Sequence, residues 1–257
     1  MIDEGVPEQF PVEEIYASHN LPGAPTGQIS TRAGIIWNSE TLFEIAVKGC
    51  GGHASMPQTG VDAITVGVEL VLAGQSVAVR KRAPASGAVL SVTEFLTDGQ
   101  RNVLSGNGAL KGDFRARSPE DRIAIERFKR QIATGVATAY GIEATVGFDT
   151  QFVETINAEL PVEPVYRAAE AAGCDPIRDR TPMSFSEDFA QFPACVPGCF
   201  LLRRNGEAGA HARPLHSLTM ISTTPCCRSA QTSGSAWYKT GCLRERTMYH
   251  DRPGSRL

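Results

Sequence analysis

The sequence predicts an α/β protein organised around a β-α-β-β-α-β module at residues 34–150. Three observations lead to this fold class. The spacing of apolar residues alternates between a strand period and a helix period, 42% of the 257 residues are hydrophobic, and no apolar run is long enough to cross a bilayer. A chain of this length forms one large domain or two ordinary ones. Disordered, collagen-like and disulfide-miniprotein classes are therefore excluded.

Apolar periodicity predicts the elements of the module. Before residue 118 we expect a strand, a largely buried helix and two more strands at 42–47, 61–79, 87–95 and 109–117. Ser118-Pro119-Glu120 supplies an N-cap, a proline at the first helical position and an early acid, so a second helix begins here and ends near Gly141. A strand over 142–148 completes the order of the ferredoxin-like split βαβ fold.

The flanking segments are less regular. Residues 1–33 are punctuated by proline and glycine and are typical of a connection around one short strand. After the module, a helix over 162–172 and a strand over 199–203 are expected. The predicted organisation has four parts: a first segment at 1–33, the module at 34–150, a second segment at 151–217 and a tail at 218–257.

The tail has a different composition. It carries a net charge of +4 within a chain whose total is −3, it contains three of the seven cysteines, and it lacks valine. Burial of so few aliphatic side chains would offset little of the conformational entropy lost when the tail becomes ordered. We therefore expect the tail to pack poorly. Its cysteines are expected to be accidental thiols.

Charge and cysteine spacing limit the partners. A net charge of −3 argues against a nucleic-acid or membrane-surface partner, since either favours a basic excess. The first five residues lack the basic and apolar regions of a signal peptide, which predicts a cytoplasmic location. No CxxC motif is present, so a structural zinc site is not expected.

Three histidines are candidates for chemistry. His19 and His216 stand where a strand is expected to end in a loop, a common place for metal ligands. His53 lies in Gly51-Gly52-His53, where glycines allow a ligand to approach the backbone. Taken singly, each is also compatible with an ordinary core or surface histidine.

Two further sites carry charge. Glu187-Asp188 is a carboxylate pair among aromatic residues, which suits orientation of a metal-bound histidine or acid–base work, although a helix start would have the same pattern. Arg115 alternates with Asp113 and Arg117, which is also typical of a solvated strand face.

Together these residues lie in motifs that resemble those of a known family. The motifs are SHNLPGAPTGQISTRAG, FEIAVKGCGGHASMPQTGVDAI, RNVLSGNGALKGDFRARSPE, SFSEDFAQF and PLHS, which together run from near the N-terminus to Ser217. They resemble the M20 family of metallopeptidases and amidohydrolases, in the branch of hippurate hydrolase and the indole-acetyl-amino-acid hydrolases. The resemblance implies a catalytic α/β domain, formed in part by residues 1–33 and 151–217, that holds two divalent metal ions such as Zn or Mn. It also implies an inserted lid at 34–150 that mediates homodimerisation, and an N-acyl amino acid substrate.

The resemblance also implies roles for single residues. His19 and His216 match metal ligands, and Glu187 matches the glutamate of the Glu-Asp-Phe motif near the metals. His53, Asn102 and Arg115 match lid positions that approach the substrate carboxylate or the tetrahedral oxyanion in family dimers. Amide, guanidinium and imidazole groups suit the binding of an anion.

The sequence departs from the family pattern at both ends. The Cys-Gly-His segment and the Glu-Glu pair, which supply further ligands and the general base, are missing before the His-Asn motif. We therefore expect an N-terminally truncated chain that holds no general base and is inactive by itself. Insertion of one base after the Ser217 codon permits a family-like continuation, Ser-Pro-Asp-Tyr-Asp-Phe-Asn-Asp, so we expect a frameshift there.

Three readings remain at this point. The first is a chain derived from a metal-dependent amidohydrolase, and the second is a non-catalytic dimerisation or binding module that retains the lid. The third, a ferredoxin-like regulatory domain unrelated to hydrolysis, does not explain why His19, Glu187 and His216 flank the module in family order. Bound metal would favour the first reading, and a stable metal-free dimer would favour the second.

Overall fold

The computed structural model describes residues 2–80 and 87–213, and it divides into two compact units. The first unit contains the described residues up to Val12, Gly34–Ile156 and Thr181–Val196. The second contains Glu13–Ala33, Asn157–Arg180 and the described residues from Pro197 onward. His216 and the tail at 218–257 lie outside the described residues. The predicted mixed α/β fold class is confirmed.

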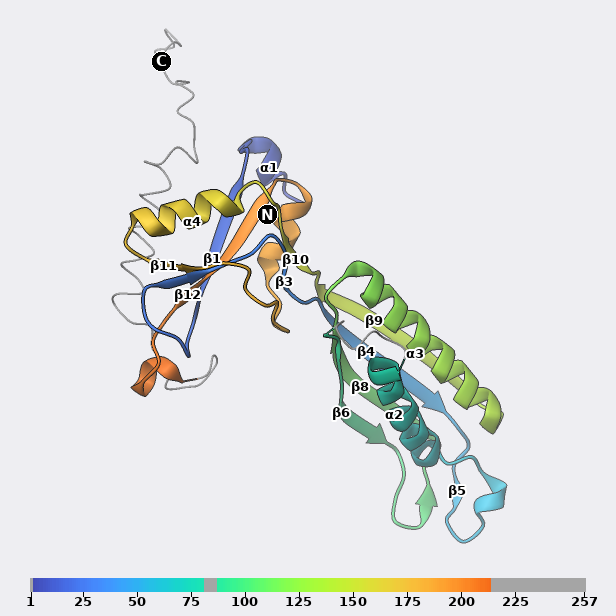
Figure 1. Cartoon of the computed structure of the whole chain (residues 1–257). Coiled ribbons are helices and arrows are strands. Elements are labelled where there is room, and N and C mark those ends of the chain that lie inside the picture. Colours follow the sequence, from blue (N-terminus) through green and yellow to red (C-terminus); the bar gives the residue numbers. More distant parts are fainter. Residues whose placement is uncertain (1, 81–86, 214–257) are drawn as a thin grey trace, which may run out of the picture. The chain divides into compact units, whose positions relative to one another are not determined.

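The first unit is built on a four-stranded antiparallel sheet in the order β6-β8-β4-β9. Its strands are β4 (Glu40–Lys48), β6 (Val89–Thr97), β8 (Asn107–Arg115) and β9 (Glu143–Phe152). Helices α2 (Ala63–Arg80) and α3 (Pro119–Tyr140) cover one face of this sheet (Figure 1). The main elements follow one another in the predicted β-α-β-β-α-β order.

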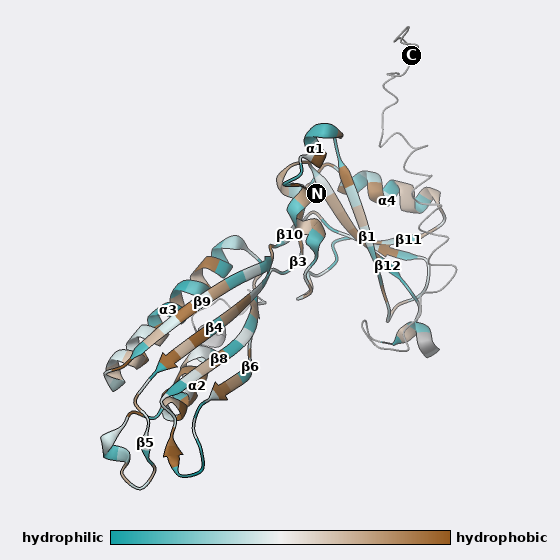
Figure 2. Cartoon of the chain, turned by 180° about the vertical axis from the view of Figure 1, so that it is seen from behind, coloured by the Kyte–Doolittle hydropathy of each residue, from teal (hydrophilic) through white to brown (hydrophobic). Residues whose placement is uncertain are grey.

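Alternating side chains decide which sheet face is covered. Along β4, Phe43, Ile45 and Val47 are buried, whereas Leu42 and Glu44 are exposed. The buried set packs with apolar residues of both helices into the core of the unit. Figure 2 shows the mixture of apolar and polar residues along these strands. Because successive strand residues point to opposite faces, the face away from the helices carries the more exposed side chains, both polar and apolar.

Helix α3 has the ends that its sequence predicts. The Ser118 hydroxyl accepts a hydrogen bond from the Asp121 amide at 3.1 Å, and Pro119 opens the helix. At the other end Gly141 takes a left-handed conformation with φ of 66°, and its amide donates to the carbonyls of Ala137 and Thr138. These caps satisfy backbone groups that the helix itself leaves unpaired.

Glycine also sets the approach of helix α2 to the sheet. A Cβ atom at Gly67 would lie 2.3 Å from the Phe95 ring. The absence of a side chain therefore lets the helix settle directly on that aromatic ring of β6.

Short elements complete the fold. Strand β3 pairs with β10, and strand β5 pairs with β7. These short elements are α1 (Val6–Gln9), β3 (Gly34–Trp37), β5 (Gly52–His53), η1 (Pro57–Thr59), β7 (Val103–Leu104), β10 (Thr155–Asn157), η3 (Asp188–Ala194) and η4 (Gly209–Ala212).

The second unit has a mixed sheet in the order β1-β12-β2-β11. Its strands are β1 (Ile15–Leu21), β2 (Gln28–Ser30), β11 (Asp175–Ile177) and β12 (Gly198–Arg204). β1 and β12 run parallel, and β12 is antiparallel to β2. Helix α4 (Val162–Ala171) packs on the face that contains Ile29, Cys199 and Leu201. The expectation of a single strand within residues 1–33 was wrong, since β2 is too short to give a periodic signal.

No helix within the described parts of the chain is long and apolar enough to cross a membrane.

The core of the first unit contains a buried lysine. Lys129 of α3 is only 3% exposed, and its Nζ lies 3.4 Å from the centre of the Phe43 ring. Burial lowers the pKa of this amine to about 8. Attraction between the ammonium and the ring offsets part of the desolvation penalty, so the charged form is disfavoured but not abolished.

We predict that Lys129 makes stability rise with pH. The unfolded chain keeps this proton up to its ordinary pKa of 10.5, whereas the folded chain loses it near 8. Between these values the unfolded state binds more protons, so the free energy of unfolding rises with pH, by on the order of 1–3 kcal/mol. Lys129→Met should remove this rise in urea titrations between pH 7 and pH 10.5.

A matched control is Lys111→Met, because this half-exposed lysine is paired with Glu44 on the other face of the same sheet. The control should keep the wild-type pH dependence. An unchanged pH dependence in Lys129→Met would show that the buried amine is not titrating.

Candidate functional site

His19 lies inside strand β1, two residues before its end, rather than in the loop that the sequence predicted. Its side chain is partly buried, and Nδ1 lies 2.6 Å from the carbonyl oxygen of Asn20. A carbonyl can only accept, so Nδ1 carries the ring proton, and in the neutral ring Nε2 holds the lone pair. A histidine that donates from one nitrogen to a backbone carbonyl presents the other in the form that a metal ion requires.

His53 has the opposite arrangement. It is exposed in β5, and its Nδ1 accepts a hydrogen bond from the Ser55 backbone amide at 3.1 Å. The Ser55 hydroxyl also lies 2.7 Å from the same nitrogen. Because Nδ1 is the acceptor, the neutral ring carries its proton on Nε2. This is the tautomer that can donate a hydrogen bond to an oxyanion.

Asn102 lies beside His53. The Ala54 amide donates to the Asn102 carbonyl at 3.0 Å, and His53 pairs with Val103 across β5 and β7. The structure therefore brings these two predicted residues together at one end of the first unit. We call the segments 50–60 and 98–106 around them the lid tip.

Asp98 holds one side of the lid tip. Its carboxylate accepts hydrogen bonds from the Ser105 hydroxyl, the Gly106 amide, and both the amide and the side chain of Asn107. These donors lower the pKa of Asp98 to about 2. The connection that carries Asn102 is thus fixed by a carboxylate that stays ionised at ordinary pH.

Arg115 lies at the other end of the sheet from the lid tip. It ends strand β8, which begins at Asn107 beside the tip. The eight residue steps between them correspond to about 26 Å along the strand. The structure thus brings His53 and Asn102 together but leaves Arg115 far from them within one chain.

Arg115 is part of a network of charges. Its Nε lies 2.7 Å from Asp113, and its Nη1 lies 3.0 Å from Glu40 and 2.9 Å from the Ser186 hydroxyl. The Ser186 hydroxyl in turn donates to Glu40 at 2.6 Å. Two carboxylates therefore neutralise the guanidinium in this conformation.

This network anchors the segment that carries Glu187. Glu187 is partly buried and precedes η3, as the helix-start interpretation anticipated. Upstream, the Trp37 and Phe185 rings pack edge to face with centres 5.1 Å apart, and Met183 pairs with Trp37. Glu40 was not identified as a site residue from the sequence, because its position at the start of a strand is the only feature that marks it.

The described residues contain no group of three or more His, Cys, Asp and Glu side chains that could hold a metal ion. His216 lies outside the residues that the structure describes. The described ranges alone therefore do not fit a two-metal centre, and a metal site would need ligands in addition to His19.

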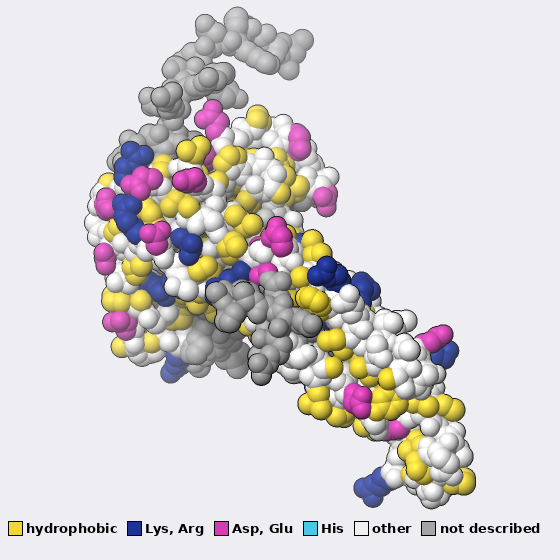
Figure 3. Space-filling view, turned by 45° about the vertical axis from the view of Figure 1, so that its right-hand side comes forward, with side chains coloured by type: hydrophobic (Ala, Val, Ile, Leu, Met, Phe, Trp, Pro, Cys, Tyr) yellow, Lys and Arg dark blue, Asp and Glu magenta, His cyan; other side chains and the backbone are white. Residues whose placement is uncertain are grey.

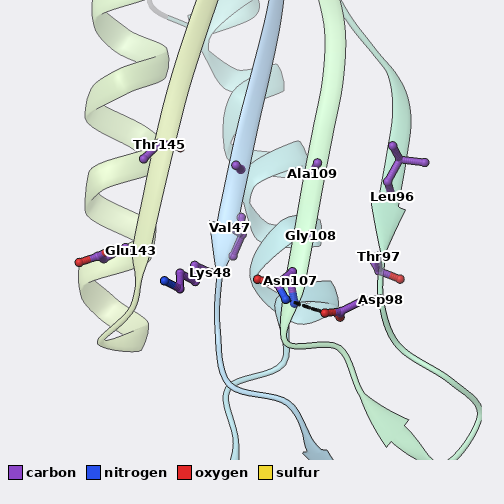
Figure 4. A pocket seen from close by; sticks show the side chains of 11 residues that line it. Val47, Lys48, Leu96, Thr97, Asp98, Asn107, Gly108, Ala109, Glu143 and Thr145 are labelled. Carbon is purple, nitrogen blue, oxygen red and sulfur yellow. Dashed lines mark hydrogen bonds between the residues drawn. The ribbon is translucent and has the colours of Figure 1, made fainter.

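Two hollows lie on the sheet of the first unit. Their volumes are about 520 and 460 Å³. Figure 4 shows the first, with side chains from all four strands and the Asp98–Asn107 hydrogen bond at its edge. No predicted site residue lines either hollow, so neither marks the expected chemistry.

Sequence comparison identifies deacetylases among the relatives of this chain. It is 29% identical over 191 residues to "N-acetylcysteine deacetylase" of Bacillus subtilis, covering 74% of this chain and 50% of that protein. It is 32% identical over 200 residues to "N-acetyldiaminopimelate deacetylase" of Enterococcus faecalis, covering 72% and 50%. The chain spans about half the length of the curated relatives it matches. No protein-family model matches it.

Solved structures share the fold. A Bacillus subtilis protein described as a dinuclear metal binding peptidase from the M20 family aligns with a TM-score of 0.75 and 22% identity, over 93% of this chain and 60% of that one. A tripeptidase of Staphylococcus aureus aligns with a TM-score of 0.70 and 16% identity, over 93% and 59%.

The fold is thus one found in solved hydrolases. The sequence relatives and structural neighbours together support the resemblance to M20 peptidases and amidohydrolases of the N-acyl amino acid deacetylase-like kind.

Proposed function

We propose that this chain contributes the lid and part of the catalytic domain of a metal-dependent hydrolase of N-acyl amino acids, with hippurate-like substrates as the narrower class. The observation that carries this proposal is the match to two N-acyl amino acid deacetylases over about three quarters of the chain. The positions of His19, His53, Asn102 and Glu187 within the family motifs support it.

The two histidine tautomers suit the two proposed tasks. His19 presents Nε2 as a lone-pair donor, which a divalent ion such as zinc or manganese needs. His53 presents Nε2–H as a hydrogen-bond donor, and Asn102 adds a side-chain amide from the turn just before β7. These donors would bind the carbonyl oxygen of the scissile amide and stabilise its developing negative charge.

Arg115 and Glu187 have supporting tasks in this proposal. Arg115 would bind the substrate carboxylate by donating hydrogen bonds from the guanidinium N–H groups that its carboxylate partners do not use. Glu187 would orient a metal ligand from the segment that Ser186 anchors to Glu40. His216 would complete the pair of histidine ligands.

The test is binding and turnover by the purified chain. N-acetyl amino acids and hippurate should bind more tightly than the free amino acids, and His53→Ala should weaken this binding about tenfold, since one hydrogen bond contributes about 1 kcal/mol or more. Turnover by this chain alone, with zinc or manganese added, is expected to be absent, because its described residues assemble no metal centre.

Ser76→Ala is a control, because this exposed hydroxyl bonds only within helix α2. Equal binding of acylated and free amino acids would refute the proposed substrate class. Metal-dependent release of amino acid would instead refute the expected inactivity and leave the substrate class standing.

We also propose a homodimer formed through the first unit. Helix α2 exposes Ile64, Val68 and Leu72 by 42%, 46% and 68%, and these residues are spaced to form one stripe. Figure 3 shows apolar side chains among the surface atoms of this unit. β6 is an edge strand of the sheet and offers a second route to pairing. A partner copy would allow the lid tip of one chain to act with Arg115 of the other.

Val68→Glu should convert the dimer into a monomer in sedimentation velocity experiments, because a charge would be buried at the centre of the stripe. Gln131→Glu places the same charge on an exposed polar position of helix α3, outside the stripe, and should leave the dimer intact. A dimer that tolerates Val68→Glu would exclude the helix face as the interface.

A further inference from the structure

Two arginines share a sheet face with His19 in the second unit. Leu202 of β12 pairs with His19 on one side and with Ser30 on the other, so these three residues lie on one face. Arg204 follows Leu202 by two positions and shares that face. The Arg180 guanidinium donates to the Ser30 hydroxyl at 3.2 Å, which places it there as well.

The two guanidinium groups disfavour one another electrostatically. Burial, and to a smaller extent the nearby charge of Arg204, lower the pKa of Arg180 to about 10. Burial lowers the pKa of Arg204 too. The Arg204 Nε is buried without a hydrogen-bond partner, and no described carboxylate lies within 4.0 Å of its nitrogens. A partly buried guanidinium such as that of Arg204 is destabilising unless an anion accompanies it.

The location fits a ligand site. Arg204 is the last residue of β12, and His19 stands near the end of the parallel neighbour β1. Open α/β sheets bind ligands at the carboxyl ends of parallel strands. From strand spacing, the Cα atoms of these two residues lie about 8 Å apart. A small ligand could therefore contact both side chains.

We propose that Arg180 and Arg204 form an anion subsite that takes a carboxylate of a small ligand. A guanidinium binds both oxygens of a carboxylate with directed hydrogen bonds, and a neutral amide cannot offset its charge. The assignment of the ligand rests on the proposed function: the carboxylate is the side-chain group of an acidic N-acyl amino acid whose amide lies beside His19.

The experiment is an NMR titration of the full chain with N-acetylglutamate, its neutral isostere N-acetylglutamine, and glutarate. Wild-type protein should bind N-acetylglutamate about tenfold more tightly than N-acetylglutamine, as expected for charge-assisted hydrogen bonds. Arg204→Met should abolish that preference. Arg203→Met is the matched control, because Arg203 lies on the opposite face of the sheet. This variant should retain the preference for N-acetylglutamate.

Thermal unfolding without ligand separates binding from folding. Arg204→Met should not lower Tm, because it removes a repulsion with Arg180. Equal binding of the acidic and neutral ligands, or equal losses in the Arg203 and Arg204 variants, would overturn the subsite alone. If glutarate binds in a way that depends on Arg204 while no N-acyl amino acid binds, the anion subsite is supported and the proposed function is refuted.

Discussion

The alternation of side chains across paired strands is the constraint on which both units depend. In the first unit it sends Phe43, Ile45 and Val47 to the helices and leaves more exposed side chains, such as Leu42 and Glu44, on the other face. In the second unit it separates an apolar set under α4 from a face with His19 and Arg204. A shift of register by one residue would exchange these sets, so packing of the core also fixes where the chemistry lies.

Local hydrogen bonds then give similar residue types different properties. His19 donates to a carbonyl and His53 accepts from an amide, so their neutral rings expose opposite functions at Nε2. Arg115 is surrounded by carboxylates, whereas Arg204 has no such described partner. These differences suit four distinct tasks: metal ligation, oxyanion binding, carboxylate binding near Glu187, and recognition of a second anion.

Much of the first unit could be predicted from its sequence because its elements are long and regular. Strand β4 alternates cleanly, and α3 has a serine cap, a first-turn proline and a terminal glycine. Two-residue strands such as β5 and β7 have no period, so the contact between His53 and Asn102 could not be derived from spacing. Their motif positions suggested a shared role, and the structure places the two residues side by side.

Charge partners were beyond sequence reasoning for a different reason. Glu40 and Arg115 are far apart along the chain, and Arg180 meets Arg204 only through the pairing of β2 with β12. Long-range pairing decides which charges meet, and local patterns carry no information about it. The expectation that the strand ends in a loop at His19 was wrong, because β1 continues to the apolar Leu21.

The assignment of opposite tautomers to His19 and His53 is the central claim, and long-range ¹H–¹⁵N correlation NMR of the imidazole nitrogens tests it most directly. At a pH where both rings are neutral, we expect the proton on Nδ1 of His19 and on Nε2 of His53. The same tautomer at both residues, or rapid exchange between tautomers at either, would contradict the account.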